Sequence, residues 1–268
     1  MTDKINQVLV IGDVHGHADR LRALLEQERP HERGARVIQL GDLGHFGEHT
    51  MVGDLECWRM ALEGEVDTVL WGNHDRAVID TRHMFGGYCS PPPETVEVIN
   101  QVDGQGRLKL AEEAHGWLLT HAGLHPQIRY MPEAGEVDRT DPRALADWIN
   151  TNPPSPFRPR LYGGSRSIVD AIGPHRGGGS TFGGVLWRDI QEKLYDGVPQ
   201  VFGHSANRKH AVRGEADRWY CVDIGGKGDR PSEDCLAAIW LPSQEIVRVD
   251  LDLMTEEIRG DLSERDLL

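Results

Sequence analysis

The chain has 268 residues, of which 38% are hydrophobic and 27% charged, and its formal net charge is −14. This composition predicts a globular chain with a sizeable core, in one large domain or two small ones. The acidic balance argues against a general nucleic-acid binder, which normally presents a basic face to phosphates. No apolar run approaches the roughly 20 residues that span a bilayer, so we expect no membrane partner.

The first residues contain a short apolar run that ends in Gly-Asp, which predicts a first strand rather than a signal peptide. The four cysteines are widely spaced and form no Cys-x-x-Cys pair: Cys57, Cys89, Cys221 and Cys235. That spacing argues against a cysteine-ligated zinc site and favours a reduced, cytoplasmic setting.

Strand and helix patterns alternate along the first half. Strands are predicted at 8–11, 36–40 and 67–71, and helices at 18–29 and 54–63. This alternation is typical of a doubly wound α/β arrangement. In such sheets functional residues gather at the carboxyl ends of the strands, and here the strands end in IGDVHG, LGDLGH and WGNHD.

The second half is richer in strand patterns. VEVI at 96–99 and RLKL at 107–110 flank the turn-rich VDGQG and predict a hairpin. Further strands are predicted at 117–121, 199–203, 218–224, 235–241 and 246–251.

Residues 126–184 hold much of the proline and glycine, and we interpret them as an insertion or lid. One helix is expected there, with Asp141 as its N-cap and Pro142 at its first position. No linker divides the chain, so we predict a single catalytic domain over 1–252 and an acidic C-terminal tail at 253–268.

Polar residues at the predicted strand ends form one set: Asp13, His15, Asp42, Asn73, His74, His121 and His204. Carboxylate, imidazole and amide groups suit Mn, Fe, Zn, Ni or Co and suit calcium poorly. Two metal ions close together need a shared anionic bridge with neutral ligands around it. One Asp serving both metals, an Asp-His pair and an Asn-His-His set meet that demand.

Five motifs follow one another in the order IGDVHG (11–16), LGDLG (40–44), WGNHD (71–75), LLTHAGL (118–124) and VFGHS (201–205). In these motifs the sequence resembles the calcineurin-like metallophosphoesterases, and the resemblance extends over residues 8 to 240. It is most similar to their phosphoprotein phosphatase and diadenosine tetraphosphatase branch. The resemblance implies a four-layer α/β/β/α sandwich of two mixed sheets flanked by helices. It also implies two divalent or transition metal ions, manganese first, with Fe, Zn, Ni, Co or Mg as alternatives.

The resemblance implies metal ligands at six positions: Asp13 and His15 on the first metal, Asp42 as the bridge, and Asn73, His121 and His204 on the second. His74 matches the histidine that protonates the leaving oxygen, and it and Asp42 are the expected catalytic residues. The nucleophile implied is a metal-bridging hydroxide, whose pKa the metals lower toward neutrality.

The stretch GDLGHFG departs from the branch pattern Gly-Asp-x-x-Asp-Arg-Gly. The second Asp, which orients the catalytic histidine, becomes His45, and the Arg that clamps the phosphate becomes Phe46. His45 is interpreted as a loop residue bonded to backbone, a substrate phosphate contact or a partner of His74. Asp75 and Glu48 are candidates for the missing carboxylate.

An arginine elsewhere is expected to contact the substrate phosphate. Arg188, in LWRD, is the first candidate and Arg76 the second, ahead of Arg166 and Arg176. An aromatic side chain at Phe46 favours a substrate with a base or another apolar leaving group.

These residues predict a dinuclear-metal phosphoesterase that acts on a small or nucleotide-type phosphorylated substrate. A Ser/Thr-type protein phosphatase is an alternative, against which the absent Arg weighs. A non-catalytic binding module on the same fold and a metal-dependent nuclease are further alternatives. The sequence leaves the oligomeric state open.

Overall fold

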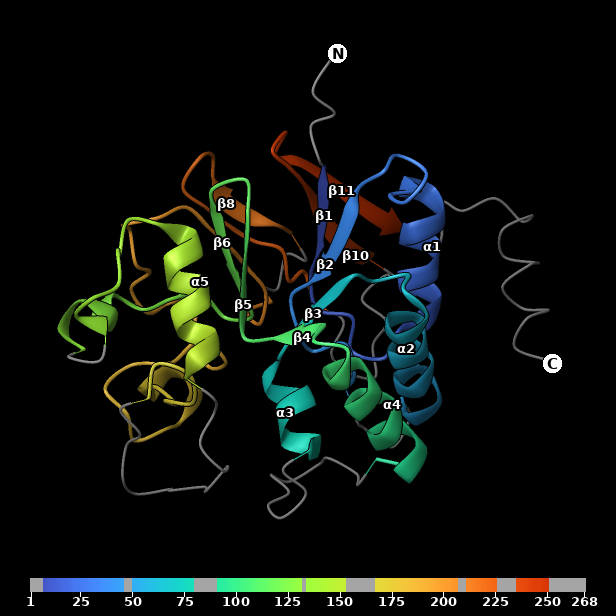
Figure 1. Ribbon diagram of the computed structural model, residues 1–268, viewed down its shortest axis with the longest axis horizontal. Helices are drawn as coiled ribbons and strands as arrows, with labels where there is room; N and C mark the ends of the chain where they lie inside the picture. The colour runs from blue at the N-terminus through green and yellow to red at the C-terminus, as the bar shows by residue number, and fades with distance from the viewer. Residues whose placement is uncertain are drawn as a thin grey trace.

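The structure is a computed structural model, and it describes residues 7–45, 50–79, 91–131, 134–152, 167–206, 211–225 and 235–250. Two mixed β-sheets form its centre (Figure 1). The first sheet has six strands in the order β11-β10-β1-β2-β3-β4. Their bounds are β1 Val8–Ile11, β2 Arg36–Gln39, β3 Thr68–Leu70, β4 Leu108–Lys109, β10 Cys235–Leu241 and β11 Glu245–Asp250.

The second sheet has five strands in the order β5-β6-β7-β9-β8. Their bounds are β5 Ala111–Ala114, β6 Trp117–Thr120, β7 Gln200–Phe202, β8 Arg213–Glu215 and β9 Trp219–Cys221. Strands β1 to β4 pair in parallel in the first sheet, and β6, β7 and β9 do so in the second. Each sheet therefore gathers several carboxyl ends at one edge, which is where a site is expected.

Alternate residues of β1 face different parts of the core. Val8 and Val10 belong to a cluster that also holds residues of the second sheet, such as Leu119 and Val201. Leu9 and Ile11 belong to a second cluster with residues of the helices. Because successive side chains of a strand point to opposite faces, this division means that β1 is buried between the other sheet and the helices.

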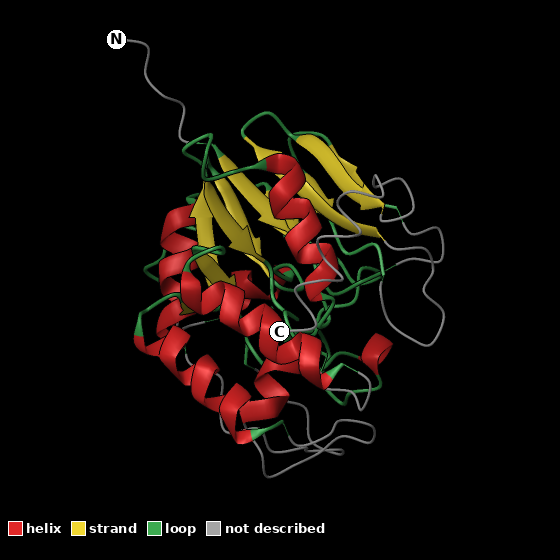
Figure 2. Ribbon diagram, turned by 90° about the vertical axis from the view of Figure 1, so that its right-hand side faces the viewer, coloured by secondary structure: helices red, strands yellow, loops and turns green. Residues whose placement is uncertain are grey.

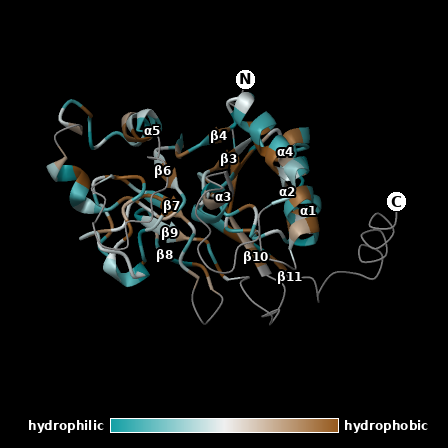
Figure 3. Ribbon diagram, turned by 90° about the horizontal axis from the view of Figure 1, so that it is seen from below, coloured by the Kyte–Doolittle hydropathy of each residue, from teal (hydrophilic) through white to brown (hydrophobic). Residues whose placement is uncertain are grey.

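Helices cover the outer faces of both sheets. Their bounds are α1 Ala18–Glu28, α2 Met51–Glu63, α3 Asn73–Ile79, α4 Pro93–Gly104 and α5 Pro142–Thr151. Helices α1, α2 and α4 lie together on the side of the first sheet, and α5 lies on the side of the second (Figure 1). A view from the side of these three helices shows helices in front of the strands (Figure 2). Figure 3 places α3 between these two groups. The α/β/β/α sandwich of two mixed sheets is thereby confirmed.

The predicted hairpin over 96–99 and 107–110 is wrong, because VEVI lies inside α4 and only the second segment forms a strand, β4. The buried residues of this helix are Thr95, Val98, Ile99 and Val102. They recur at the i, i+3, i+4, i+7 spacing of one helical face. Pro93 occupies the first turn, where a missing N–H costs nothing. The alternation of apolar residues in VEVI indicated a strand only because the window was too short to show this longer period.

The other predicted elements agree with the structure to within a few residues. The strands at 8–11, 36–40, 67–71, 117–121, 199–203, 218–224, 235–241 and 246–251 correspond to β1, β2, β3, β6, β7, β9, β10 and β11. The predicted cap of α5 is confirmed, since Asp141 accepts a hydrogen bond from the Arg143 amide at 2.9 Å. Helix α3 and strands β5 and β8 were not anticipated.

Among its described residues, the Pro/Gly-rich segment 126–184 contains α5 and the 3-10 turns η1 (Pro126–Tyr130) and η3 (Pro174–Arg176). Helix α5 packs against β5 and β6, and its Asn150 side chain bonds the main chain of Leu110 and Ala111. The lid function of the segment stays a prediction, and the acidic tail lies outside the described residues. Among the described residues, no helix is both long and apolar enough to cross a membrane.

Candidate active site

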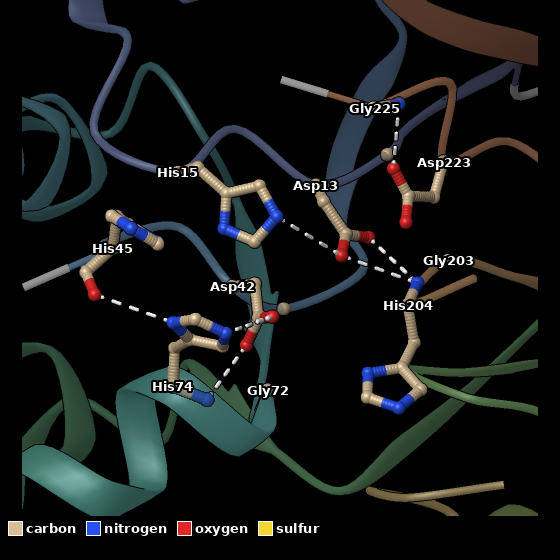
Figure 4. Close-up of polar contacts among 12 residues, drawn as sticks. Asp13, His15, Asp42, His45, Gly72, His74, Gly203, His204, Asp223 and Gly225 are labelled. Atoms are coloured by element: carbon tan, nitrogen blue, oxygen red, sulfur yellow. Dashed lines mark hydrogen bonds and ion pairs between the residues drawn. The ribbon is translucent and has the colours of Figure 1, made fainter. Parts of the chain in front are cut away.

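The seven strand-end residues singled out in the sequence come together where parallel strands of both sheets end. Figure 4 labels Asp13, His15, Asp42, His74 and His204 among them. From the first sheet, β1 leads to Asp13 and His15, β2 to Asp42, and β3 to Asn73 and His74; from the second sheet, β6 leads to His121 and β7 to His204. All except Asp13 are buried, and Asp42 and His121 have no exposed surface. Burial of so many ionisable groups is costly unless they bind one another or an ion.

Asp42 belongs to two clusters of potential metal ligands. One cluster holds Asp13, His15 and Asp42, and the other holds Asp42, His121 and His204; within each, the ligand atoms lie within 4.8 Å of one another. Figure 4 shows Asp42 in the middle, with the His15 and His74 rings on one side and His204 on the other. This arrangement fits the two-metal pattern, although the metal-ligand roles stay predictions.

The contacts of His121 indicate how a cation would fit. Its Nδ1 lies 2.9 Å from the Leu40 carbonyl oxygen, and because a carbonyl only accepts, Nδ1 carries the hydrogen. The neutral ring then directs its Nε2 lone pair inward. That Nε2 lies 3.0 Å from Asn73 Oδ1, 3.1 Å from His204 Nδ1 and 3.6 Å from Asp42 Oδ1. Two imidazole nitrogens, an amide oxygen and a carboxylate oxygen thus converge on one point, a donor set that fits a metal ion.

Three of these residues adopt left-handed backbone conformations that non-glycine residues rarely occupy. The φ angles are 54° at His15, 53° at Asp42 and 65° at His204. Each such conformation costs on the order of 1–3 kcal/mol and persists where the surrounding structure imposes it, often at functional sites.

Two glycines leave room for the aspartates. A Cβ on Gly72 would lie 2.2 Å from Asp42 Oδ1, and a Cβ on Gly203 would lie 2.0 Å from Asp13 Oδ1. Real Cβ atoms do not approach so closely, so any side chain at either position would displace a carboxylate. Glycine is therefore required at these positions of WGNHD and VFGHS because a side chain would clash with the neighbouring carboxylate.

His74 lies at the start of α3, beside Asp42. Its amide donates to Asp42 Oδ1 at 2.8 Å, and its Nε2 lies 3.7 Å from Asp42 Oδ2. Its Nδ1 lies 3.3 Å from the carbonyl oxygen of His45, and the two rings stack with centroids 5.0 Å apart. The structure thus brings His45 to His74, as one of the interpretations of His45 expected.

Asp75 also lies in this region and is fully buried. Its carboxylate accepts main-chain hydrogen bonds from Leu43, Gly44 and Gly72. Burial, together with the negative charge of Asp42, raises the pKa of Asp75 well above its usual value. The Asp75 carboxyl group thus bonds the loop after β2 and the Gly72 amide after β3.

The candidate arginines have different surroundings. The Arg188 side chain is buried and donates to the carbonyl oxygens of Ala122, Asp189 and Glu192. Burial lowers the pKa of its guanidinium to about 10. Arg76 lies with its guanidinium carbon 5.8 Å from the centre of the Trp71 ring.

Arg176, at the end of η3, lies closer to the ligand set. Its guanidinium donates to the His204 carbonyl oxygen at 3.1 Å and to Ser205 Oγ at 3.0 Å, and its Nε lies 2.9 Å from the Asp189 carboxylate. The substrate contacts predicted for Arg188, Arg76 and His45 stay predictions. Phe46, Glu48 and Arg166 lie outside the described residues.

Two buried aspartates near the site were missed in the sequence. Asp54, in the first turn of α2, accepts a hydrogen bond from the His45 amide at 2.8 Å. Asp223 follows β9 and accepts from the Gly225 amide at 2.9 Å (Figure 4). The position of Asp223 after a strand could have marked it. Asp54 lies on a predicted helix and carried no signal.

Two mixed sheets with outer helices, and a buried set of carboxylate, imidazole and amide groups at the strand ends, are the arrangement expected of a metallophosphoesterase. A family model described as calcineurin-like phosphoesterase matches residues 7–208. The chain therefore belongs to the calcineurin-like phosphoesterase family. Divalent metals are the cofactors of this family.

Curated relatives match part of the chain. The symmetrical bis(5'-nucleosyl)-tetraphosphatase of Glaesserella parasuis serovar 5 is 31% identical over 130 residues, which are 44% of this chain and 45% of that protein. The same enzyme of Actinobacillus pleuropneumoniae serotype 5b is 30% identical over 129 residues, again 44% and 45% of the two chains. The match thus spans about half the length of these curated relatives.

A solved structure of a candidate diadenosine tetraphosphatase superposes with a TM-score of 0.50 at 16% identity. It covers 93% of this chain and 96% of that one, so the likeness extends over the whole fold.

Proposed function

We propose that the protein is a dinuclear-metal phosphoesterase whose substrate is a small, nucleotide-type phosphate ester of the dinucleoside polyphosphate class. One observation carries the metal site: the His121 Nε2, with its tautomer fixed by the Leu40 carbonyl, faces the oxygens of Asn73 and Asp42 and the Nδ1 of His204. The tetraphosphatase activity of the partially matching relatives supports the substrate class.

In this proposal Asp13 and His15 hold one metal ion, and Asn73, His121 and His204 hold the other, with Asp42 shared between them. When bound, the two ions supply Lewis acidity and activate water at neutral pH. Manganese is the ion we expect first, because the donor set of oxygen and imidazole nitrogen suits it.

His74 protonates the leaving group. Water loses one proton to solvent as its oxygen bonds to phosphorus, the bond from phosphorus to the leaving oxygen breaks, and that oxygen takes the proton from His74 Nε2. His74 then takes up a proton from solvent before the next turnover. The Nε2 faces the shared carboxylate at 3.7 Å from Asp42 Oδ2, so it lies on the ligand side of the ring. General acid catalysis of this kind typically contributes about 10²–10⁴-fold to the rate.

The test combines metal analysis with a substrate panel. The purified protein is analysed for bound metal, then stripped with a chelator and assayed with Mn²⁺ on diadenosine tetraphosphate, p-nitrophenyl phosphate, its bis ester and a phosphoserine peptide. We expect activity to disappear on stripping, to return with Mn²⁺ and to be highest on the dinucleotide. A preference for the phosphopeptide would instead assign a protein phosphatase.

Asp42→Asn is the diagnostic variant, and Asp103→Asn, an exposed position on α4, is the matched control. Removing a residue that only hydrogen-bonds to a metal ligand already lowers metal affinity or activity about 10–100-fold. Removing the shared carboxylate itself should therefore lower kcat/KM by more than about 100-fold. Asp103→Asn should retain full metal content and activity. A wild-type protein that binds no divalent metal and hydrolyses none of these esters would contradict the proposal.

A further inference from the structure

Three successive amides of the loop after β2 donate to buried carboxylates. Leu43 and Gly44 donate to Asp75 at 3.3 and 3.1 Å, and His45 donates to Asp54 at 2.8 Å. Both carboxylates are buried, with relative exposures of 0% for Asp75 and 1% for Asp54. Asp75 and Asp54 thus accept hydrogen bonds from three amides in a row inside the protein, which holds the main chain at His45 in place.

The carbonyl of His45, fixed in this way, meets the ring of His74. The distance from its oxygen to His74 Nδ1 is 3.3 Å, and the two rings stack at an interplanar angle of 26°. Because the carbonyl oxygen only accepts, the contact requires a hydrogen on Nδ1. The opposite nitrogen, Nε2, then faces Asp42, on the side of the predicted metal ligands.

We infer that the main-chain carbonyl of His45, held in place by Asp54 and Asp75, orients His74 and selects its Nδ1–H tautomer. The inference rests on the proposed function, in which His74 is the proton donor. Asp54 and Asp75 are then positioning residues, since they act through the loop and the His45 carbonyl. The His45 side chain contributes by stacking and is not the hydrogen-bond acceptor.

The proton balance agrees with this assignment. Before transfer the imidazolium carries hydrogens on both nitrogens, with Nδ1–H donated to the His45 carbonyl. After Nε2 has given its proton to the leaving oxygen, the ring is the neutral Nδ1–H tautomer and keeps the same hydrogen bond. The His45 carbonyl therefore stabilises the neutral Nδ1–H tautomer that remains after the proton transfer, and the ring does not need to rotate.

A competing role for the same residues is a cation site, since ligand atoms of His15, His45 and His74 lie within 4.8 Å of one another. In that case the His45 ring would be a ligand, and His45→Ala would lower the number of metal ions bound. Under our inference the carbonyl remains in His45→Ala, and both the metal content and the His74 tautomer are retained. Loss of a metal ion or of the tautomer in His45→Ala overturns the inference.

The direct test is the tautomer of His74 in the metal-free protein, read from long-range ¹H–¹⁵N spectra of histidine-labelled samples above the histidine pKa. His74→Gln assigns the signal. We expect the Nδ1–H form in the wild type, and an Nε2–H form overturns the inference without any further variant.

Asp54→Ala removes the acceptor of the His45 amide, and Thr50→Ala is the matched control. Thr50 Oγ1 donates to the other carboxylate oxygen of Asp54 at 3.0 Å, so the control leaves the bond to His45 in place. We expect the Asp54→Ala protein to lose the single tautomer and the Thr50→Ala protein to keep it. Asp54→Asn retains an acceptor oxygen and should restore the signal. An unchanged His74 tautomer in a folded Asp54→Ala protein overturns the inference.

Kinetics on two leaving groups provide the second readout. An alkyl phosphate needs protonation of its leaving oxygen far more than p-nitrophenyl phosphate does. Asp54→Ala should therefore lower kcat on the alkyl ester at least about tenfold more than on the aryl ester, with KM little changed. An equal fall on both esters overturns the positioning role. If His74→Gln itself affects both esters equally, the proposed role of His74 fails, and the spectra still decide the tautomer.

Discussion

Replacing Gly72 with alanine tests whether the position of Asp42 controls metal binding. The backbone of Gly72 is not in the left-handed region, so alanine imposes no conformational strain there. The new Cβ would lie 2.1 Å from the Asp42 amide nitrogen and 2.2 Å from its Oδ1, where ordinary contact begins at 3.4 Å. Asp42 and its carboxylate must therefore move by about 1 Å, a displacement that can cost about 100-fold in rate when it affects reacting geometry.

The matched control is Gly104→Ala at the end of α4, where a Cβ would meet no heavy atom within 4 Å. Helix propensity makes that change neutral or stabilising by up to about 1 kcal/mol. We expect Gly72→Ala to lose about 1–3 kcal/mol of stability from overpacking and most of its bound metal. Metal content, calorimetric melting and kcat/KM on p-nitrophenyl phosphate measure these effects. Full metal content with kcat/KM within about threefold of wild type would refute the steric reasoning.

The other predictions concern the arginines and the half-buried His125. Arg188→Ala leaves buried carbonyls without their donor and should lose about 3 kcal/mol or more of stability, whereas Arg176→Ala removes a partly exposed side chain and should raise KM with a smaller loss of stability. A folded Arg188→Ala protein with wild-type Tm and raised KM would reverse these assignments. Burial lowers the pKa of His125, so the unfolded state binds more protons and stability falls as pH drops through about 6.5. His125→Asn keeps an acceptor for the Gln127 amide but does not titrate, so its Tm should fall less than that of wild type on acidification; an equal fall would contradict this.

The clustering of the candidate metal ligands could be predicted from the sequence because their placement is mostly local. A ligand that follows a buried parallel strand reaches the sheet edge whatever the rest of the fold does, and Asp13, Asp42 and Asn73 obey this rule. The glycines next to them reflect close approach, as the Gly72 contact with Asp42 shows. Strands and ligands were therefore predicted by the same pattern.

The arginine contacts could not be predicted this way, because they depend on segments that are distant in sequence. Arg188 looked suitable from its place in LWRD, yet its donors are engaged by the carbonyls of Ala122 and Glu192. Arg176 lies in a Gly-rich stretch with no periodicity, and only the fold brings it to Ser205. Whether an arginine side chain is buried, and which groups it contacts, depends on the tertiary structure and is not encoded in a local motif.

The same distinction explains the atypical GDLGHFG stretch. A missing aspartate in a motif suggests a missing function, because a motif records side chains. Here the atom that meets His74 is a main-chain oxygen, which every residue type provides, and what makes it effective is the pair of buried carboxylates that hold the loop. The identity of residue 45 is then free to change as long as Asp54 and Asp75 remain. The chain can therefore depart from the motif at His45 and still present an oriented histidine beside Asp42.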